Sequence, residues 1–238
     1  MMIKSKIIVT GGSGRFGKTL KTIKSKYKFI YPRKNELNIL NVSSIRKYLK
    51  RNKTKKILHL AGLSRPMVMH EKNINKSINL NIIGTANLVN VCDDLKIKLI
   101  YFSTSYVYPG NKGNYKETDS VLPWNNYAWS KLGGECAVQM YKNSLILRVC
   151  MTEKPFVHKR AFANVKLNFI FYEDIAKIMI KLINKKGIIN LGGPTKTVYN
   201  FAKKYNSKIK KIYNKKNSNN FPMNPFMNLA KLTRLIKK

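Results

Sequence analysis

The chain has 238 residues, and its 47 lysine and arginine side chains against 10 acidic ones give a formal net charge of +37. Hydrophobic residues make up 44% of it, which is enough for a full core and excludes a chain that is disordered throughout. No apolar run approaches the roughly 20 residues that a membrane helix needs, and Ile7-Ile8-Val9 is too short for a signal peptide. Three widely spaced cysteines (Cys92, Cys136 and Cys150) favour a reducing compartment, so we expect a cytoplasmic protein.

The excess of positive charge has two interpretations. A polyanionic partner, either nucleic acid or an anionic membrane surface, would account for it. However, the lysines are spread along the chain, and only the stretch 203–216 is a dense basic run. Lysine, asparagine and isoleucine are all abundant, as in proteins from A/T-rich genomes, and this favours genome composition over a specific nucleic-acid partner. A positive surface would still steer anionic cofactors and substrates.

Strands and helices are predicted to alternate along most of the chain. Short apolar runs predict strands at 4–10, 27–31, 56–61, 98–103, 145–149 and 187–191. Helical spacing of apolar residues predicts helices at 16–25, 42–49, 74–95, 126–141, 173–184 and 198–205. Ser43 or Ser44 is expected to cap the second of these helices. The segment 208–225 is expected to be a loop, and 227–238 a short closing helix.

This alternation predicts an α/β fold of the Rossmann type. Right-handed crossovers between parallel strands place helices on both faces of a doubly wound sheet. We expect residues 1–150 to form the dinucleotide-binding domain. Residues 151–238 are expected to form a small C-terminal lobe on the substrate side, which includes a returning strand.

A glycine-rich turn follows the first predicted strand and opens the first predicted helix. Gly11, Gly14 and Gly17 have the spacing G-x-x-G-x-x-G, which lets the backbone approach a pyrophosphate at a helix N-terminus. The segment 12–19 also matches the phosphate-binding motif of NTPases, G-x-x-x-x-G-K-[ST]. The glycine turn therefore predicts a nucleotide phosphate site, and the remaining motifs must decide between the two.

The second strand ends without the acid that an NAD enzyme usually carries for the ribose hydroxyls. It ends in Tyr31-Pro32-Arg33-Lys34, and the first carboxylate is Glu36. Arg33 and Lys34 would favour a 2′-phosphate. NADP is therefore predicted over NAD, although NAD stays possible.

A row of hydroxyl side chains, Ser103 to Tyr108, follows the fourth predicted strand, where open parallel sheets place their sites. Tyr127 and Lys131 come next, four residues apart and so on one helix face. A neighbouring ammonium and a positive nicotinamide ring would lower the pKa of the phenol, and Tyr127 could then exchange a proton with a carbonyl. The same spacing in Tyr108/Lys112 and Tyr199/Lys203 lacks this context.

Together these residues resemble the extended short-chain dehydrogenase/reductases of the NAD-dependent epimerase/dehydratase superfamily, which act on nucleotide sugars. The resemblance covers the chain to about Tyr205 and excludes the NTPase interpretation. It includes the glycine turn, His59 to Gly62, Asn81 to Leu88, the Ser103-Thr104 strand end, Tyr127/Lys131 and Tyr172 to Ala176. By resemblance, Thr104, Tyr127 and Lys131 are catalytic: Thr104 polarises the substrate oxygen, Tyr127 is the acid/base, and Lys131 holds the nicotinamide ribose.

The subgroup that the chain resembles most is the dTDP-4-dehydrorhamnose reductase-like proteins. The segments 36–39, 103–108 and 192–195 resemble theirs, whereas Ser105-Tyr106 lacks the acid pair of a 4,6-dehydratase. The stretch 150–168 departs from the family, because it is short and carries Glu153 and Lys154. The resemblance and the glycine turn together assign cofactor binding to a set of residues: Gly11, Gly14, Arg15, Phe16, Gly17, Arg33, Asn38, Ile39, Leu60, Ala61, Gly62, Asn81, Tyr127 and Lys131.

We therefore predict an NAD(P)-dependent oxidoreductase that transfers hydride to a nucleotide-linked sugar, most simply a 4-keto-sugar reductase. The alternatives are a nucleotide-sugar 4-epimerase with a tightly bound cofactor and, in another class, a non-catalytic dinucleotide sensor. A homodimer is possible by resemblance.

Other residues that could carry chemistry are given structural roles. His59 is expected in the core, and His70 and His158 have no matching partners, so no metal site is predicted. Trp124 and Trp129 are expected to pack against core or helix. Arg65 and Arg148 could meet a diphosphate or form structural pairs.

Overall fold

A six-stranded parallel sheet forms the centre of the protein. The structure is a computed structural model, and it describes residues 5–215 and 221–237. The strands follow the order β10-β5-β4-β3-β1-β2, with every neighbouring pair parallel. Their bounds are β1 Lys6–Thr10, β2 Lys28–Ile30, β3 Lys56–His59, β4 Lys98–Thr104, β5 Ser144–Val149 and β10 Gly187–Leu191. The predicted Rossmann-type fold is confirmed.

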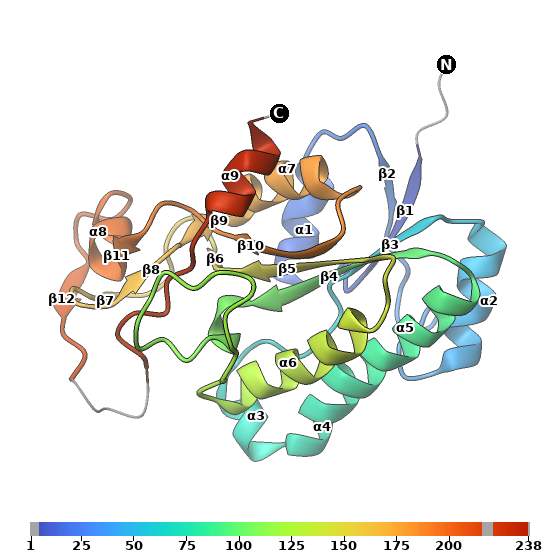
Figure 1. Ribbon diagram of the computed structural model, residues 1–238, viewed down its shortest axis with the longest axis horizontal. Helices are drawn as coiled ribbons and strands as arrows, with labels where there is room; N and C mark the ends of the chain where they lie inside the picture. The colour runs from blue at the N-terminus through green and yellow to red at the C-terminus, as the bar shows by residue number, and fades with distance from the viewer. Residues whose placement is uncertain (1–4, 216–220, 238) are drawn as a thin grey trace.

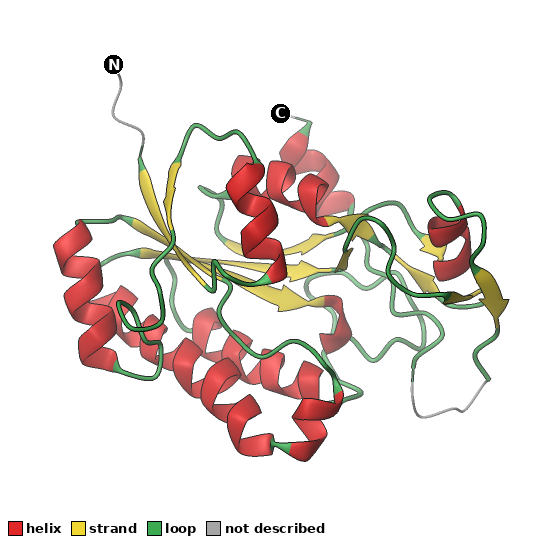
Figure 2. Cartoon of the chain, turned by 180° about the vertical axis from the view of Figure 1, so that it is seen from behind, coloured by secondary structure: helices red, strands yellow, loops and turns green. Residues whose placement is uncertain are grey.

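Helices cover both faces of this sheet, as Figures 1 and 2 show from opposite sides. One core lies between the sheet and the helices α1 (Arg15–Thr22), α7 (Tyr172–Leu182) and α9 (Ala230–Ile236). The other core lies under α2 (Val42–Asn52), α5 (Gly84–Asp94) and α6 (Asn126–Gln139). Strand residues alternate between these cores: Ile57 and Leu99 face α2 and α5, whereas Leu58 and Ile100 face α1 and α7. This alternation explains why buried parallel strands are apolar at every position.

The small lobe lies at one end of the sheet and is built from short pairs of strands (Figure 1). Its strands are β6 Met151–Thr152, β7 Arg160–Phe162, β8 Lys166–Leu167, β9 Ile170–Phe171, β11 Lys196–Thr197 and β12 Lys210–Ile212, with α8 at Val198–Lys203. They pair as β6 with β9, β7 with β12 and β8 with β11 around a third apolar core. However, β10 and α7 belong to the main sheet and its core, so the segment predicted as the lobe contributes to both parts of the molecule.

The predicted helix at 74–95 is interrupted. It consists of α4 (Ile74–Ile78), a π-helical turn at Asn79–Ile83 and α5, and a short α3 (Val68–Lys72) precedes it. A π-turn inserts one residue into the helical register, so the apolar spacing does not identify the buried face here: Ile78 and Ile83 are exposed, whereas Asn81 is buried. Such turns are frequent at functional sites.

Two further expectations are corrected. The N-cap of α2 is Asn41, whose side chain accepts the Ser44 backbone N–H, and not Ser43 or Ser44. The segment predicted as a loop at 208–225 contains β12, a strand too short to show a pattern. Residues 1–4, 216–220 and 238, which belong to the predicted first strand, the loop and the closing helix, lie outside the described residues. Within the described ranges, no helix is long and apolar enough to cross a membrane.

Candidate functional site

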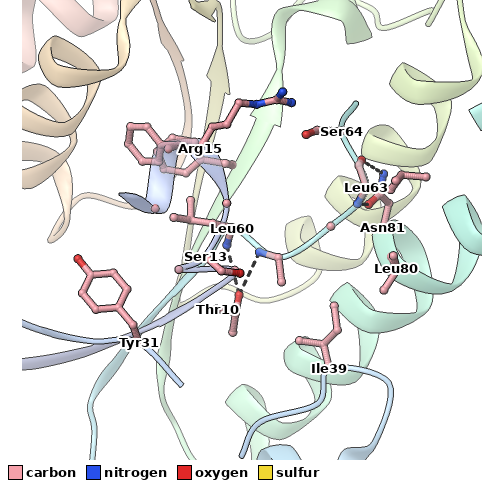
Figure 3. Close-up of a pocket in the computed structure, with 18 of the residues that line it drawn as sticks. Thr10, Ser13, Arg15, Tyr31, Ile39, Leu60, Leu63, Ser64, Leu80 and Asn81 are labelled. Carbon is pink, nitrogen blue, oxygen red and sulfur yellow. Dashed lines mark hydrogen bonds between the residues drawn. The ribbon is translucent and has the colours of Figure 1, made fainter. Parts of the chain in front are cut away.

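A cavity of about 680 Å³ opens along the carboxyl ends of the central strands. The residues predicted to bind the cofactor all line it: Gly11, Gly14, Arg15, Phe16, Gly17, Arg33, Asn38, Ile39, Leu60, Ala61, Gly62, Asn81, Tyr127 and Lys131. Figure 3 shows part of this wall, with the glycine turn, the Leu60–Ser64 loop and Asn81 around a common space. The structure therefore brings together segments from across the first 131 residues, and their roles remain predictions.

The glycine turn allows the closest approach of backbones in the cavity. Gly11 has φ +70°, and a Cβ there would lie 2.5 Å from the Ala61 backbone nitrogen. Thr10 fastens the same two segments, because its hydroxyl accepts the backbone N–H groups of Leu60 and Ala61 (Figure 3). Helix α1 starts at Gly14 without a side-chain cap, so its first N–H groups are available for an anion.

The part of the cavity beside the end of β2 is basic. Arg33 and Lys34 line it together with Lys21, and no carboxylate is among the lining residues. Glu36 is occupied elsewhere, because its carboxylate accepts the Arg33 backbone N–H at 2.8 Å. A carboxylate for ribose hydroxyls is therefore absent from this part of the described wall, as the sequence predicts for an NADP site.

Asn81 lies in the π-turn and ties three segments together. Its Oδ1 accepts the Leu63 N–H at 2.7 Å, and its Nδ2 donates to the Leu63 carbonyl at 2.9 Å and to Ser130 Oγ at 2.8 Å. Ser130 in turn donates to the Tyr127 carbonyl. The π-turn therefore presents one amide that fixes the cavity loop to the first turn of α6.

Tyr127 lies in the first turn of α6, which Asn125 caps. Its side chain is half-buried and hydrogen-bonds to Thr104, the last residue of β4. Burial raises the pKa of Tyr127, while the Thr104 hydrogen bond and the positive charge of Arg65 lower it. The structure thus pairs the buried Thr104 with Tyr127, and Tyr127 and Lys131 mark what we call the reacting end of the cavity.

The Lys131 side chain packs against a tyrosine ring, and its pKa is lower than that of an ordinary lysine. Its ammonium lies 4.0 Å from the ring centroid of Tyr101, and burial lowers its pKa to about 7, an effect that the Glu135 charge opposes. The groups that lower the pKa of Tyr127 are Thr104 and Arg65, and Lys131 is not among them. The expected acidification of the phenol by Lys131 is therefore corrected for this arrangement.

A carboxylate bridges two arginines beside the cavity. Glu153 pairs with Arg15 at 3.1 Å and with Arg65 at 3.0 Å. Arg15 reaches from the start of α1 toward the loop that carries Ser64 (Figure 3). Arg65 therefore has a structural pair, although its charge still reaches Tyr127.

A second ion pair, between Glu135 and Arg148, is fully buried next to β4. Glu135 and Arg148 are 0% and 2% exposed, and Glu135 Oε1 accepts from Arg148 Nε at 3.0 Å and from its NH2 at 2.6 Å. The other oxygen of Glu135 accepts from the Ser103 hydroxyl. Arg148 is thus a structural partner and does not reach a diphosphate. Glu135 was not predicted from the sequence, although its spacing of four residues from Lys131 was a signal.

The remaining candidates have structural roles. His59 is buried between the hydroxyls of Thr10 and Thr85, and burial lowers its pKa to about 3. His70 is buried against Ser77. Trp124 packs on Tyr106 and Phe221, whereas Trp129 is 49% exposed and does not belong to the core. Over the described ranges, no group of His, Cys, Asp and Glu side chains could hold a metal ion.

Comparison with known proteins identifies relatives of two kinds. Methionine adenosyltransferase 2 subunit beta of Xenopus laevis is 30% identical over 152 residues, which cover 60% of this chain and 45% of that protein. A dTDP-4-dehydrorhamnose reductase of Aggregatibacter actinomycetemcomitans is 25% identical over 201 residues, which cover 80% of this chain and 63% of that protein. The chain therefore spans less than two thirds of the length of either relative.

Solved structures share the whole fold. The dTDP-4-dehydrorhamnose reductase of Bacillus anthracis in complex with NADP superposes with a TM-score of 0.86 at 22% identity, covering 98% of this chain and 92% of that one. The enzyme of the same name from Yersinia enterocolitica gives 0.80 at 23% identity, with 98% and 93% covered. A family model described as the RmlD substrate binding domain matches residues 5–164. The chain belongs to this RmlD substrate binding domain family, as the resemblance in its sequence predicted.

Proposed function

We propose that this protein binds NADP and reduces the 4-keto group of a nucleotide-linked sugar. One observation carries the proposal: Tyr127, which is hydrogen-bonded to the buried Thr104, lines a cavity that is also lined by a glycine turn at a helix N-terminus. Residues 1–150 would supply most of the cofactor site, and residues 151–238 the substrate side.

The cavity fits a dinucleotide phosphate by three features. The uncapped N-terminus of α1 offers N–H groups to a pyrophosphate. Gly11 and Gly17 leave no room for a side chain, so ligand and backbone can approach closely. Arg33 and Lys34 provide positive charge where the 2′-phosphate of NADP would lie. The Bacillus anthracis relative, solved with NADP, supports this choice of cofactor.

The residues of this chain would divide the reaction among them. Thr104 and Tyr127 would hold the substrate carbonyl oxygen by hydrogen bonds, and Tyr127 would give that oxygen its proton. Lys131 would bind the nicotinamide ribose and so orient the cofactor. NADPH, when bound, supplies the hydride. Arg65 would lower the pKa of Tyr127 from the substrate side, which eases the proton transfer.

The choice of a reductase rests on the dTDP-4-dehydrorhamnose reductase of Aggregatibacter actinomycetemcomitans among the relatives. The test is NADPH consumption, followed by absorbance, over a panel of 4-keto nucleotide sugars. Turnover with at least one of them is expected. A cofactor that co-purifies and is regenerated without net consumption would instead support a nucleotide-sugar 4-epimerase.

A second candidate function, a dinucleotide-binding subunit without catalysis, is favoured by the similarity to methionine adenosyltransferase 2 subunit beta. In that case the protein would bind NADP as a sensor and need no proton donor. Substituting Tyr127→Phe discriminates the two functions, because a sensor would keep its function after loss of the phenol hydroxyl.

We further propose a cytoplasmic homodimer. The structure has free thiols at Cys92, Cys136 and Cys150, which supports a reducing compartment. Sedimentation velocity of the purified protein tests the dimer, and a single species with the mass of one chain would exclude it.

A further inference from the structure

Glu135 has no role in the proposed proton and hydride transfer, yet it lies on the same helix as Tyr127 and Lys131. Tyr127, Lys131 and Glu135 follow one another at intervals of four residues, so they share one face of α6. The face is pressed tightly onto its neighbours: a Cβ at Gly134 would lie 2.4 Å from the Asn81 carbonyl oxygen. The neighbouring Glu135 side chain is fully buried.

The carboxylate of Glu135 is held in one place by three elements. Arg148 of β5 donates to its Oε1 through two nitrogens, at 3.0 Å and 2.6 Å. Ser103 of β4, which lines the cavity next to Thr104, donates to its Oε2. Gln139, one turn further along α6, donates to its Oε1 at 3.4 Å. The negative charge is therefore fixed relative to both α6 and the strand end that carries Thr104.

Burial disfavours the charged form of the Lys131 side chain. Its carbonyl accepts the Tyr101 hydroxyl, and its Nζ lies against the Tyr101 ring of β4. Burial and, second to it, the nearby Lys131 charge lower the pKa of the His59 imidazole on β3, so His59 is neutral. Tyr127 is the other titratable group on this face and is also neutral. Glu135 is the negative charge that favours the charged form of Lys131.

We infer that Glu135 is a positioning residue that acts through Lys131: it holds the lysine in its charged form for the dinucleotide and locks α6 to the strand end of Thr104. Arg148 keeps the carboxylate in place and does not line the cavity. This role rests on the proposed function, because it requires that Lys131 binds the cofactor.

The experiment measures NADPH affinity by fluorescence from mildly acidic to mildly alkaline pH. In the wild type, affinity falls as the pH rises through the pKa of Lys131, which is about 7 in the free protein. Replacing Glu135→Gln alone would leave Arg148 buried without a charged partner. The pair is therefore replaced together, as Glu135→Gln with Arg148→Met, and circular dichroism checks the fold.

The expected result is a midpoint that moves to lower pH by about one unit or more, with affinity at neutral pH weakened about fivefold or more. In the Lys131→Arg background the same pair should leave the pH dependence unchanged, because a guanidinium stays charged. Asp119→Asn, which removes a carboxylate paired with Lys112 outside the cavity, is the control and should keep the wild-type midpoint.

An unchanged midpoint in the double variant would overturn the inference while NADPH binding, and with it the proposed function, stands. If the wild type does not bind NADPH at any pH, the proposed function falls and this role falls with it. If the double variant does not fold, Glu135→Asp serves instead, since it keeps the charge for Arg148 but draws it away from Lys131. A smaller shift in the same direction is then expected, and no shift would overturn the inference.

Discussion

The two ends of the cavity are built on different principles. The phosphate end is made of backbone: Gly11 approaches Ala61 so closely that a Cβ has no room, and the positive charges around it are on exposed side chains. The reacting end is made of side chains: Thr104, Tyr127 and Lys131 are at least half-buried and rest on polar groups that are buried more deeply.

This difference separates two kinds of recognition. Backbone N–H groups at a helix N-terminus bind a phosphate without any titration near neutral pH, so affinity there depends on shape and salt. Buried side chains have shifted pKa values, so chemistry at the reacting end depends on pH and on fixed neighbours such as Glu135. Substitutions at the two ends should therefore fail in different ways.

The largest effect is expected at Tyr127. Tyr127→Phe removes the proton donor, and kcat for reduction of a 4-keto nucleotide sugar should fall about 100- to 10,000-fold. The affinity for NADPH should change little, because the ring remains. Tyr199→Phe on α8, a tyrosine four residues before Lys203, is the matched control and should keep full activity. Equal kcat in Tyr127→Phe and wild type would contradict the assignment of the reacting end.

Removing one partner of the buried ion pair should cost nearly as much, in stability. Arg148→Met leaves the Glu135 carboxylate buried and unpaired, and the free energy of unfolding should fall by about 3 to 5 kcal/mol. The double replacement with Glu135→Gln should recover most of this loss, because no charge then remains in the core. Urea unfolding measures both, and a double variant no more stable than Arg148→Met would refute the pairing as the cause.

At the phosphate end, Gly11→Ala tests the close approach of the backbone. Strain at positive φ costs on the order of 1 to 3 kcal/mol, and the clash with Ala61 adds to it, so NADPH affinity should fall at least about tenfold. Gly187→Ala is the matched control, since Gly187 has φ +79° but no atom within 4 Å of an added Cβ. It should lose some stability but keep NADPH affinity. Equal affinities in both variants would show that the glycine turn does not contact the cofactor.

Acid should destabilise the protein through His59. Its pKa is lowered to about 3 in the fold, against about 6.5 unfolded, so the unfolded chain binds more protons between these values. Stability is therefore full above the unfolded pKa and falls by about 1.4 kcal/mol per pH unit as the pH decreases toward 3. His59→Gln should flatten this dependence in urea unfolding. If the free energy of unfolding of His59→Gln depends on pH as steeply as that of the wild type, other groups cause this dependence.

The smallest effect is expected at Arg33. If the proposed cofactor site is correct, Arg33→Ala would remove one charge-assisted contact to the 2′-phosphate, which is worth about 1.5 kcal/mol or about tenfold in NADPH affinity. The affinity for NADH, which lacks that phosphate, should not change. Arg234→Ala on α9 controls for loss of positive charge in general. If Arg33→Ala lowers the affinity for NADPH and for NADH equally, Arg33 does not contact the 2′-phosphate.

The central sheet could be predicted because buried parallel strands are short, continuous apolar runs bounded by turns. The range predicted for β10 is the range observed, and the glycine turn lies where its context required. The strands of the small lobe have only two or three residues, too few for any period to appear. The π-turn at Asn79–Ile83 shifts the helical register by one residue, so it buries Asn81 and exposes Ile78 and Ile83, which the apolar spacing could not indicate.

Site residues that belong to a sequence motif could be predicted. The effect of burial on the charge of a side chain could not. Tyr127, Lys131 and Thr104 follow from spacing and strand ends, and the structure places Tyr127 and Lys131 on the cavity wall with the buried Thr104 next to Tyr127. The contact of Lys131 with Tyr101 and the charge of Glu135 depend on how α6 packs against β4. Long-range contacts of this kind join residues about 30 positions apart.

The most direct test of the account is a fluorescence titration of the purified protein with NADPH and with NADH. The account predicts saturable binding of both at one site per chain, with NADPH bound more tightly and with that preference reduced by added salt. Absence of saturable binding for either dinucleotide would contradict the assignment of the cavity.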